Sequence, residues 1–330
     1  MIDLNNIRNG WAFSRLLGTP AAAKLCLMRV LPSKDRKAVT HVKVPGLSGG
    51  MWMRPDGSDM KVVLQTFAGR DYGLGWCEPY RAHMLALCKS ILEVGDTPLI
   101  IDAGANVGAS TLLFASAFPG CHIYAIEPDA DNFATLKANT SDKPDITLFH
   151  AGLWGKPTNL AVKQEGDAGW ACRVQEHSVG GAATLPSVTL PELLARNPKM
   201  RPVIVKIDIE GAEVEVLKEG TGWVDDIPLM VFEAHDNLWH WLGPWQGSGH
   251  SFFSCLARRK REYLSKGENV YAFLHPDEMQ PLCRVAAALQ TAVTYPLEPL
   301  CGRPLRRKDN LTFGAAVGCG HVSGLRLRFS

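Results

Sequence analysis

Residues 99–108 read Leu-Ile-Ile-Asp-Ala-Gly-Ala-Asn-Val-Gly and hold the most informative motif of the chain. The apolar run Leu99–Ile101 predicts a short buried strand that ends at the carboxylate of Asp102. Gly104 allows a sharp turn after this strand, and Gly108 allows a ligand to approach the start of the following helix. A strand that leads through an acid and a glycine turn into a helix is typical of α/β proteins that bind an adenosine-containing cofactor.

The residues after this motif alternate between helical and strand patterns. Helical spacing covers Thr111–Phe118 and Asp131–Asn139, and apolar runs at Ile123–Ile126 and Ile146–Phe149 predict strands. Apolar runs without alternation are typical of parallel strands that are covered on both faces. The order of strands and helices therefore predicts an α/β fold with a Rossmann-like, doubly wound sheet.

Residues 152–200 interrupt this pattern with Gly-rich turns and short predicted strands. These strands form an expected β-rich insertion, at Asn159–Lys163, Trp170–Val174 and Ala183–Leu190. Thr189 is a good helix N-cap, so we expect a short helix over Pro191–Arg196 to follow the insertion.

The α/β pattern then resumes. A strand is expected at Val203–Ile207, a helix at Ala212–Glu219 and another strand at Leu229–Phe232. Residues 250–266 have the pattern of a further helix, and Val270–Leu274 is expected to be a late strand.

We expect three regions along the chain, namely an N-terminal helical and β flank at 1–95, a cofactor-binding domain at 96–275 and a C-terminal extension of unassigned role at 276–330. Within the flank, a basic amphipathic helix is expected at Thr19–Leu31, with short strands at His41–Val44 and Met51–Arg54. That helix allows peripheral contact with a membrane, but its basic residues are few, so packing on the core is favoured.

The composition excludes several classes of protein. Hydrophobic residues make up 46% of the 330 residues and charged residues 21%, which excludes a disordered chain. A formal charge of only +2 gives no electrostatic footprint for nucleic-acid binding. No run of about 18 apolar residues predicts a transmembrane segment, and no signal peptide is evident. The 9 scattered cysteines lack a C-x-x-C pair, which favours reduced thiols and a cytoplasmic location.

Acidic residues at predicted strand ends favour a cationic cofactor. Glu127 ends the strand after the glycine turn, where an acid binds the two hydroxyls of a ribose. Gly104 and Gly108 do not form the dinucleotide fingerprint, because Asn106 stands between them. A pyrophosphate about 4 Å from Asp102 would be repelled by about 4 kcal/mol at an effective dielectric constant of about 20. The sulfonium and ammonium groups of S-adenosylmethionine would instead be attracted, and a glycine turn without any ligand is the alternative.

Two later segments add groups that suit proton transfer. Asp208 ends a buried strand, so we expect it at the carboxyl edge of the sheet, where open α/β proteins bind ligands. Glu233 and His235 follow the next strand and should lie at the same edge. Imidazole titrates near neutrality, which suits a base that accepts an alcohol proton. Glu213 is expected to be a structural cap at a helix N-terminus.

Other features have both a structural and a functional interpretation. Five residues have the chemistry to surround Mg²⁺, but their spacing does not demand it and we assign no metal: Glu210, Glu213, Glu233, His235 and Asp236. Trp239, Trp241 and Trp245 are either core residues or a surface that stacks on sugars. The basic runs Arg258–Arg261 and Arg303–Lys308 are expected to be solvated faces rather than sites for phosphate or anionic glycans.

Several blocks of the sequence together resemble the FkbM-type S-adenosylmethionine-dependent methyltransferases, which have the class I methyltransferase fold. The main blocks are residues 101–108 with Ala125-Ile126-Glu127-Pro128, then Lys206-Ile207-Asp208-Ile209-Glu210-Gly211-Ala212-Glu213, and Phe232-Glu233-Ala234-His235-Asp236. Residues 53–59, Asp71-Tyr72 and Gly267-Glu268-Asn269 also look like parts of this family. The resemblance covers about residues 50–275.

The resemblance implies a mainly parallel seven-stranded sheet with its last strand reversed. It also implies O-methylation of a hydroxyl, commonly on a sugar of a surface polysaccharide or on a glycosylated metabolite. The residues implied to hold the methionine part of the cofactor are Asp102, Gly104, Asn106 and Gly108, with Glu127 on the ribose. Asp208 would lie at the mouth where the methyl group is transferred, and the catalytic candidates are His235, Asp208 and Glu233.

Three other functions stay open at this point. One is methylation of a nucleic acid or of another small molecule. The acidic strand ends disfavour the nucleic acid, because they repel phosphates. A dehydrogenase is disfavoured by the missing dinucleotide fingerprint. A module that binds a cofactor or a partner protein without catalysis is the alternative from a different class. The sequence names neither the acceptor nor the oligomeric state.

Overall fold

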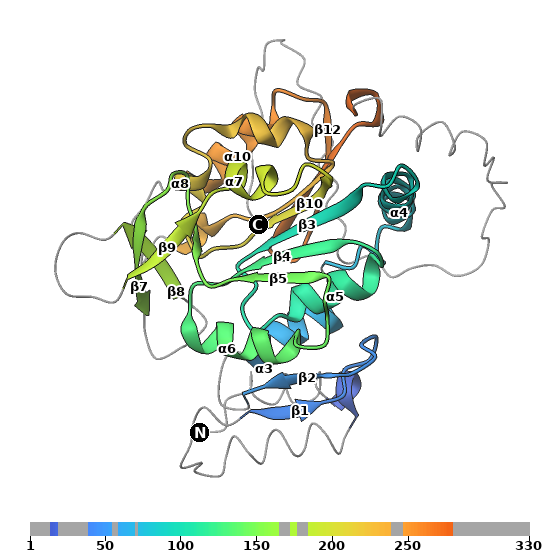
Figure 1. Cartoon of the computed structure of the whole chain (residues 1–330), viewed down its shortest axis with the longest axis vertical. Helices are drawn as coiled ribbons and strands as arrows, with labels where there is room; N and C mark the ends of the chain where they lie inside the picture. The colour runs from blue at the N-terminus through green and yellow to red at the C-terminus, as the bar shows by residue number, and fades with distance from the viewer. Residues whose placement is uncertain are drawn as a thin grey trace, which may run out of the picture.

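A computed structural model of the chain describes residues 14–18, 39–54, 59–69, 72–164, 172–176, 184–238 and 247–279. Figure 1 shows a central sheet between helices, with a small hairpin at the bottom of the view and a β-rich segment at its left. Four expectations lie wholly or mostly outside the described residues. They are the helix Thr19–Leu31, the tryptophans Trp239, Trp241 and Trp245, the basic run Arg303–Lys308, and the C-terminal extension, of which only 276–279 is described.

Seven strands form the central sheet, in the order β12-β13-β11-β10-β3-β4-β5. They are β3 (Thr97–Ala103), β4 (His122–Ile126), β5 (Ile146–Phe149), β10 (Met200–Ile207), β11 (Leu229–Glu233), β12 (Arg261–Lys266) and β13 (Asn269–Leu274). Every neighbouring pair is parallel except the two pairs that contain β13, which runs antiparallel to β11 and β12. The expected doubly wound sheet with a reversed last strand is confirmed.

Helices cover both faces of this sheet and build two apolar layers. They are α4 (Glu78–Glu93), α5 (Ala109–Ala117), α6 (Ala130–Asn139), α7 (Leu190–Ala195), α8 (Glu213–Val216) and α10 (Ser248–Leu256). On one face, Leu87 of α4 and Phe114 of α5 pack in one cluster with Ile100 of β3. On the other face, the ring of Phe252 in α10 stacks on Phe232 of β11 with 4.0 Å between ring centroids. Strands that are buried on both faces explain the continuous apolar runs.

A second sheet lies between β5 and β10 in the sequence, where the β-rich insertion was expected. Its strands are β6 (Gly152–Leu153), β7 (Asn159–Gln164), β8 (Cys172–Glu176) and β9 (Thr184–Val188), in the order β6-β9-β7-β8. Leu160, Val174 and Leu185 from this sheet belong to the same core cluster as the central strands. Thr189 then caps α7, because its side chain accepts from the backbone N–H of Glu192 and the Glu192 side chain bonds back to Thr189.

The N-terminal flank begins with the expected hairpin of β1 (Thr40–Val42) and β2 (Met51–Met53). After it come α3 (Asp59–Val63) and a π-helical turn, η1 (Leu64–Ala68). Met51 and Met53 are buried in a cluster with Val107 and Leu112, so the hairpin packs on the helix that follows the glycine turn. Figure 1 shows the hairpin beside α3 and α6.

The expected helix over 250–266 is wrong in its second half. The helix α10 ends at Leu256, and Arg261–Lys266 form the edge strand β12, which pairs with β13. Arg261 is buried and donates to the carbonyl oxygens of Val224, Ile227 and Ala272, at 2.6, 2.9 and 3.2 Å. Pairing with a neighbouring strand therefore overrides the local helical pattern, and the basic run is not wholly a solvated face.

The expected helix at Ala212–Glu219 is shorter, because α8 spans only Glu213–Val216. Gly220 then adopts a left-handed conformation with φ +63°, which ends the segment before the 3-10 helix η2 (Thr221–Asp226). Two more 3-10 turns follow later, η3 (His235–Leu238) and η4 (Pro276–Glu278).

The sequence also led to expectations about thiols and membrane-spanning segments. The described cysteines with free thiols, Cys77, Cys88, Cys121 and Cys255, are all buried. In the described part of the chain, no helix combines the length and apolar character that a membrane crossing requires.

Candidate active site

A pocket of about 160 Å³ lies at the carboxyl ends of β3, β4, β10 and β11, and we call it the strand-end pocket. Its walls include six residues that the sequence singled out: Gly104, Asn106, Glu127, Asp208, Glu233 and His235. A cavity of about 580 Å³ lies elsewhere, beside Trp52, Ile123 and Ile146 at the opposite edge of the sheet. We place the site in the smaller pocket, because ligands of open α/β sheets bind at the carboxyl edge.

The glycine turn fixes how closely two strand ends approach one another. Gly104 has φ +77°, and a Cβ atom there would lie 1.7 Å from the carbonyl oxygen of Asp208. Gly108 has φ +90°, and a Cβ atom there would lie 2.8 Å from a methyl carbon of Leu136. Gly104 therefore lets β3 and β10 end side by side, whereas Gly108 is required by packing against α6 and is not part of the pocket wall.

Asp102 lies beneath the pocket and is fully buried. Its carboxylate accepts hydrogen bonds from Ser110 Oγ at 2.7 Å and Thr111 Oγ1 at 2.6 Å, and its other oxygen lies 3.1 Å from Lys206 Nζ. Asp102 is not among the residues that line the pocket. Its negative charge is compensated by Lys206, and the carboxyl groups that line the pocket include those of Glu127, Asp208, Glu210 and Glu233.

Lys206 is a buried cation that sequence reasoning missed. Besides Asp102, its Nζ atom contacts the carbonyl oxygen of Gly104 at 2.9 Å and lies 3.5 Å from Asp208. Burial lowers the pKa of Lys206, but the carboxylates of Asp102 and Asp208 outweigh burial and raise it overall. A lysine inside the apolar run of β10 was the available signal, because an ammonium in a buried strand requires partners.

Glu127 projects into the pocket from the end of β4 and is almost completely buried. It accepts hydrogen bonds from the backbone N–H groups of Asn106 at 2.8 Å and Asp129 at 2.9 Å. Burial raises the pKa of Glu127 to about 7, although these two hydrogen bonds act in the opposite direction. The carboxylate is therefore fixed in position and titrates near neutral pH.

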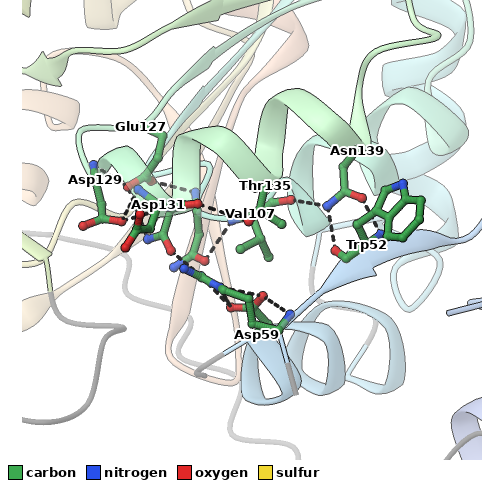
Figure 2. Close-up of polar contacts among 11 residues, drawn as sticks. Trp52, Asp59, Val107, Glu127, Asp129, Asp131, Thr135 and Asn139 are labelled. Carbon is green, nitrogen blue, oxygen red and sulfur yellow. Dashed lines mark hydrogen bonds and ion pairs between the residues drawn. The ribbon is translucent and has the colours of Figure 1, made fainter. Parts of the chain in front are cut away.

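Hydrogen bonds link residues of the N-terminal flank to the carboxylate of Glu127. Arg54 donates from Nη2 to Asp59 at 2.7 Å and to Asn132 Oδ1 at 2.5 Å, and Asn132 Nδ2 lies 3.4 Å from Glu127. Asn139 at the end of α6 bonds to the backbone of Trp52 in β2 and of Val107. Figure 2 shows these contacts as a continuous row along α6, from Glu127 at one end to Trp52 at the other.

His235 lies at the centre of four carboxylates. Its Nδ1 atom is 2.7 Å from Glu213 Oε1, and its Nε2 atom is 3.5 Å from Glu210, 3.7 Å from Asp208 and 3.8 Å from Glu233. The His235 side chain is 4% exposed and Glu213 is fully buried. Glu213 also accepts from the backbone N–H of Ile209, so it fixes the turn before α8 and in addition holds the imidazole. The N-cap of α8 is Ala212, so Glu213 is not the cap residue itself.

The carboxylates around His235 change the protonation that was expected for it. Burial lowers the pKa of His235, but Glu213, Asp208 and Glu210 outweigh burial and raise it to about 10. Burial and the neighbouring Asp208 raise the pKa of Glu233 to about 9. Without a cation in the pocket, His235 therefore holds its proton at neutral pH more firmly than a free imidazole does.

The backbone around Glu210 is also unusual. Glu210 has φ +57°, in the left-handed region that favours glycine, and the next residue, Gly211, has φ +96°. This turn brings the Glu210 side chain into the wall of the pocket. Asp236, by contrast, bonds to the backbone N–H groups of Ser248 and Gly249 at the start of α10 and does not line the pocket.

Other pocket residues come from segments far away in the sequence. Lys61 and Thr66 reach the pocket from the N-terminal flank, Tyr72 from the segment before α4, and Glu268 from the turn between β12 and β13. Tyr72 and Glu268 belong to the weaker blocks of the family resemblance. No sequence signal pointed to Lys61 or Thr66, because only the tertiary structure brings η1 and α3 to this edge of the sheet.

Comparisons with known proteins point to a methyltransferase. A family model described as Methyltransferase FkbM domain matches residues 102–241. The hexuronic acid methyltransferase AglP of Haloferax volcanii is 25% identical over 144 residues, which cover 43% of this chain and 58% of AglP. Methyltransferase 1 of Beauveria bassiana is 25% identical over 174 residues, which cover 46% of this chain and 70% of that protein. The chain thus aligns with less than two thirds of AglP.

Among solved structures, a putative O-methyltransferase from Klebsiella pneumoniae is similar over 58% of this chain and 79% of that chain. The TM-score is 0.32 and the sequence identity is 10%. A precorrin-6y C5,15-methyltransferase from Geobacter metallireducens has a TM-score of 0.31 at 13% identity, over 57% of this chain and 87% of that chain.

Proposed function

Because residues 102–241 form a methyltransferase domain of the FkbM type, we propose that the protein transfers a methyl group from S-adenosylmethionine to a hydroxyl of a carbohydrate. The observation that carries this proposal is the strand-end pocket, in which Glu127 lies on one side of the glycine turn and Asp208, Glu233 and His235 lie on the other.

The residues of the pocket fit the cofactor. Glu127 uses two backbone donors for orientation, and its carboxylate oxygens retain further lone pairs for the hydroxyls of a ribose. Gly104 lets β3 and β10 end side by side at the pocket, since a Cβ atom there would clash with the carbonyl oxygen of Asp208. Asp208 supplies negative charge for a sulfonium or an ammonium group, and Glu233 adds to it when a nearby positive charge favours the loss of its proton. Asp102 and Gly108 do not line the pocket. Asp102 holds Lys206 in place, and Gly108 allows close packing against α6.

When bound, S-adenosylmethionine supplies an electrophilic methyl group whose bond to sulfur breaks as a new bond to oxygen forms. The protein then has to align the acceptor hydroxyl with that methyl group and to accept its proton. Alignment of reacting groups is worth about 7–11 kcal/mol when it is complete. Asp208, Glu233 and His235 are our candidates for positioning the hydroxyl and moving its proton, because their polar atoms all lie within 4.8 Å of one another.

A carbohydrate acceptor is supported by the relative AglP, whose name describes a hexuronic acid methyltransferase. The acidic pocket also disfavours a nucleic acid, because its carboxylates repel phosphates. We therefore place a sugar ahead of RNA and DNA as the acceptor. A sugar acid is also an anion, so its place among the candidates rests on the relative AglP alone.

Two measurements test the proposal. Calorimetry should detect binding of S-adenosylhomocysteine and no binding of NADH, and the opposite result would overturn the proposal. Transfer of a labelled methyl group should then be assayed on free uronic acids, neutral oligosaccharides, nucleotide sugars and an RNA oligonucleotide. Incorporation into RNA alone would contradict the carbohydrate acceptor but not the methyltransferase.

The variant His235→Ala tests the reacting side of the pocket. Turnover should fall by about 10²–10⁴-fold, the typical contribution of a group that handles a proton. The affinity for S-adenosylhomocysteine should stay unchanged, because His235 lies on the side away from Glu127. Unchanged turnover would remove His235 from the mechanism, and His235→Gln repeats the test with a side chain that still fills the space.

A further inference from the structure

Three side chains from two strand ends point at one small space in the strand-end pocket. Asp208 follows β10, Glu233 is the last residue of β11, and His235 follows Glu233 after one residue. One ligating atom from each lies within 4.8 Å of the other two. His235 Nε2 is nevertheless 3.7 Å from Asp208 and 3.8 Å from Glu233, so these atoms face one another without forming hydrogen bonds.

The carboxylate of Glu213 fixes the orientation of the His235 ring. Its Nδ1 atom bonds to the buried carboxylate of Glu213 at 2.7 Å, which leaves Nε2 as the nitrogen that faces the cluster. A carboxylate that holds the rear nitrogen of an imidazole is the usual second partner of a metal-binding histidine. The His235 side chain is 4% exposed, and Nε2 faces the carboxylates of Asp208, Glu210 and Glu233 at 3.5–3.8 Å. A cation that binds Nε2 takes the place of the proton on this nitrogen.

A buried carboxylate oxygen of Glu210 at the same place lacks a hydrogen bond in the described structure. Glu210 Oε2 lies 3.5 Å from His235 Nε2 and is buried without a hydrogen bond in the described structure. A buried carboxylate oxygen without a donor costs free energy unless a cation or a donor reaches it. Lys206 does not provide that cation, because its ammonium is already used by Asp102 and by the carbonyl oxygen of Gly104. His235 is the other nearby positive charge, and its one Nε2 atom is shared among Glu210, Asp208 and Glu233.

We infer that Asp208, Glu233 and His235 form a binding site for one hard divalent cation of the Mn²⁺ or Mg²⁺ kind. Two carboxylates and one imidazole suit Mn²⁺ and its neighbours better than a soft metal, since no cysteine lines the described pocket. Glu210 is close enough to take part, and Glu213 is the positioning residue that orients His235.

The role of this cation rests on the proposed function, whereas its binding does not. Such an ion binds oxygen atoms of a sugar and makes a hydroxyl more acidic, which eases the loss of its proton during methyl transfer. It would also offset the repulsion among the carboxylates at the mouth, where Asp208, Glu210 and Glu233 lie together.

Binding of Mn²⁺ to the purified full chain tests the inference without any methyl acceptor. The electron paramagnetic resonance signal of free Mn²⁺ disappears on binding, so titration should show one site per chain. Glu233→Gln should weaken this binding at least tenfold, and Asp208→Asn serves as the second variant if Glu233→Gln does not fold. The matched control Glu215→Gln removes a partly exposed carboxylate on α8, outside the cluster, and should bind Mn²⁺ as the parent does.

Two outcomes would overturn the cation site. One is a folded parent protein that leaves the Mn²⁺ signal unchanged at about 1 mM, the weak end for protein sites that bind hard cations. The other is Mn²⁺ binding that survives both Glu233→Gln and Asp208→Asn. Calorimetry with S-adenosylhomocysteine on the same samples separates the two ideas, because cofactor binding without Mn²⁺ binding contradicts the cation and leaves the methyltransferase intact.

Discussion

Single residues explain why the strand-end pocket has its charge. The sequence places acids at the ends of β3, β4 and β10, and the structure confirms these positions. The partner of each acid could not be predicted, because Lys206, Ser110 and Asn132 reach their acids only after the strands are aligned. Asp102 is consequently part of a buried ion pair, although its place in the sequence suggested direct contact with the cofactor.

The buried pair of Lys206 and Asp102 gives the first prediction. Lys206→Met should lower the free energy of unfolding by about 3–5 kcal/mol, because it leaves Asp102 charged and unpaired in the core. The double variant Lys206→Met with Asp102→Asn should recover part of this loss. Urea denaturation measures both, with Lys218→Met on the surface as a control that should change by less than about 0.5 kcal/mol. Equal losses in the single and double variants would argue against the pair.

Glu127 gives a prediction about pH. Its pKa of about 7 means that the carboxylate is ionised above pH 7 and becomes neutral as the pH falls below 7. Ribose hydroxyls donate to the ionised form, so affinity for S-adenosylhomocysteine should fall up to about tenfold between pH 8 and pH 6. The stability of the protein without cofactor should change in the opposite direction. Because the pKa of Glu127 is raised by folding, the free energy of unfolding should fall as the pH rises from 4.5 to 7.

Calorimetry across this pH range checks the expected change in affinity. In Glu127→Gln the affinity should be low at every pH and should no longer change between pH 6 and pH 8. A parent protein whose affinity is flat over the same range would show that Glu127 does not titrate when the cofactor binds.

Elements explain which of the expected features survive in the structure. Strands with long apolar runs, such as β3 and β10, were predicted well because burial on both faces dominates their sequence. The strand β12 was assigned to a helix, since its alternating pattern is weak and only pairing with β13 reveals it. The helix α8 ends early for a similar reason, because the chain turns at Gly220 into η2.

The N-terminal flank illustrates how one element serves another. Asp59 at the start of α3 is fully buried and bonds to Arg54, and the following residues Lys61 and Thr66 line the pocket. We expect Asp59→Asn to cost about 1.5–3 kcal/mol, the range for hydrogen bonds to charged groups, and to weaken cofactor binding because α3 loosens. Thermal unfolding and calorimetry measure the two effects. Asp142→Asn, at an exposed carboxylate in the turn after α6, should leave both unchanged.

The whole molecule is held together by a core that crosses the boundary between the central sheet and the insertion. Leu160 and Val174 of the second sheet are buried in one cluster with Ile101 and Val205 of the central strands. The sequence indicated the insertion but not this shared core, because the contacts join residues that are far apart along the chain. The second sheet should therefore unfold together with the domain that carries the pocket.

Leu160→Ala tests whether the second sheet and the central sheet unfold together. The variant should lose about 2–5 kcal/mol, the usual cost of removing a buried leucine side chain, and should still show a single unfolding transition. Saturating S-adenosylhomocysteine, at about 100 times its dissociation constant, should then add about 2.7 kcal/mol to the parent. Leu92→Ala, at a partly exposed residue of α4, is the control. Two separate transitions would show that the insertion is an independent unit.

The left-handed backbone at Glu210 has a consequence for how this protein responds to selection in the laboratory. A side chain in that conformation costs about 1–2 kcal/mol relative to glycine, so a glycine or asparagine there would relax the chain. A screen that selects for heat resistance alone would therefore favour loss of this acid. The resulting protein would be more stable but would lack one carboxylate of the pocket. Engineering for robustness should hold position 210 fixed and seek its gains at the surface.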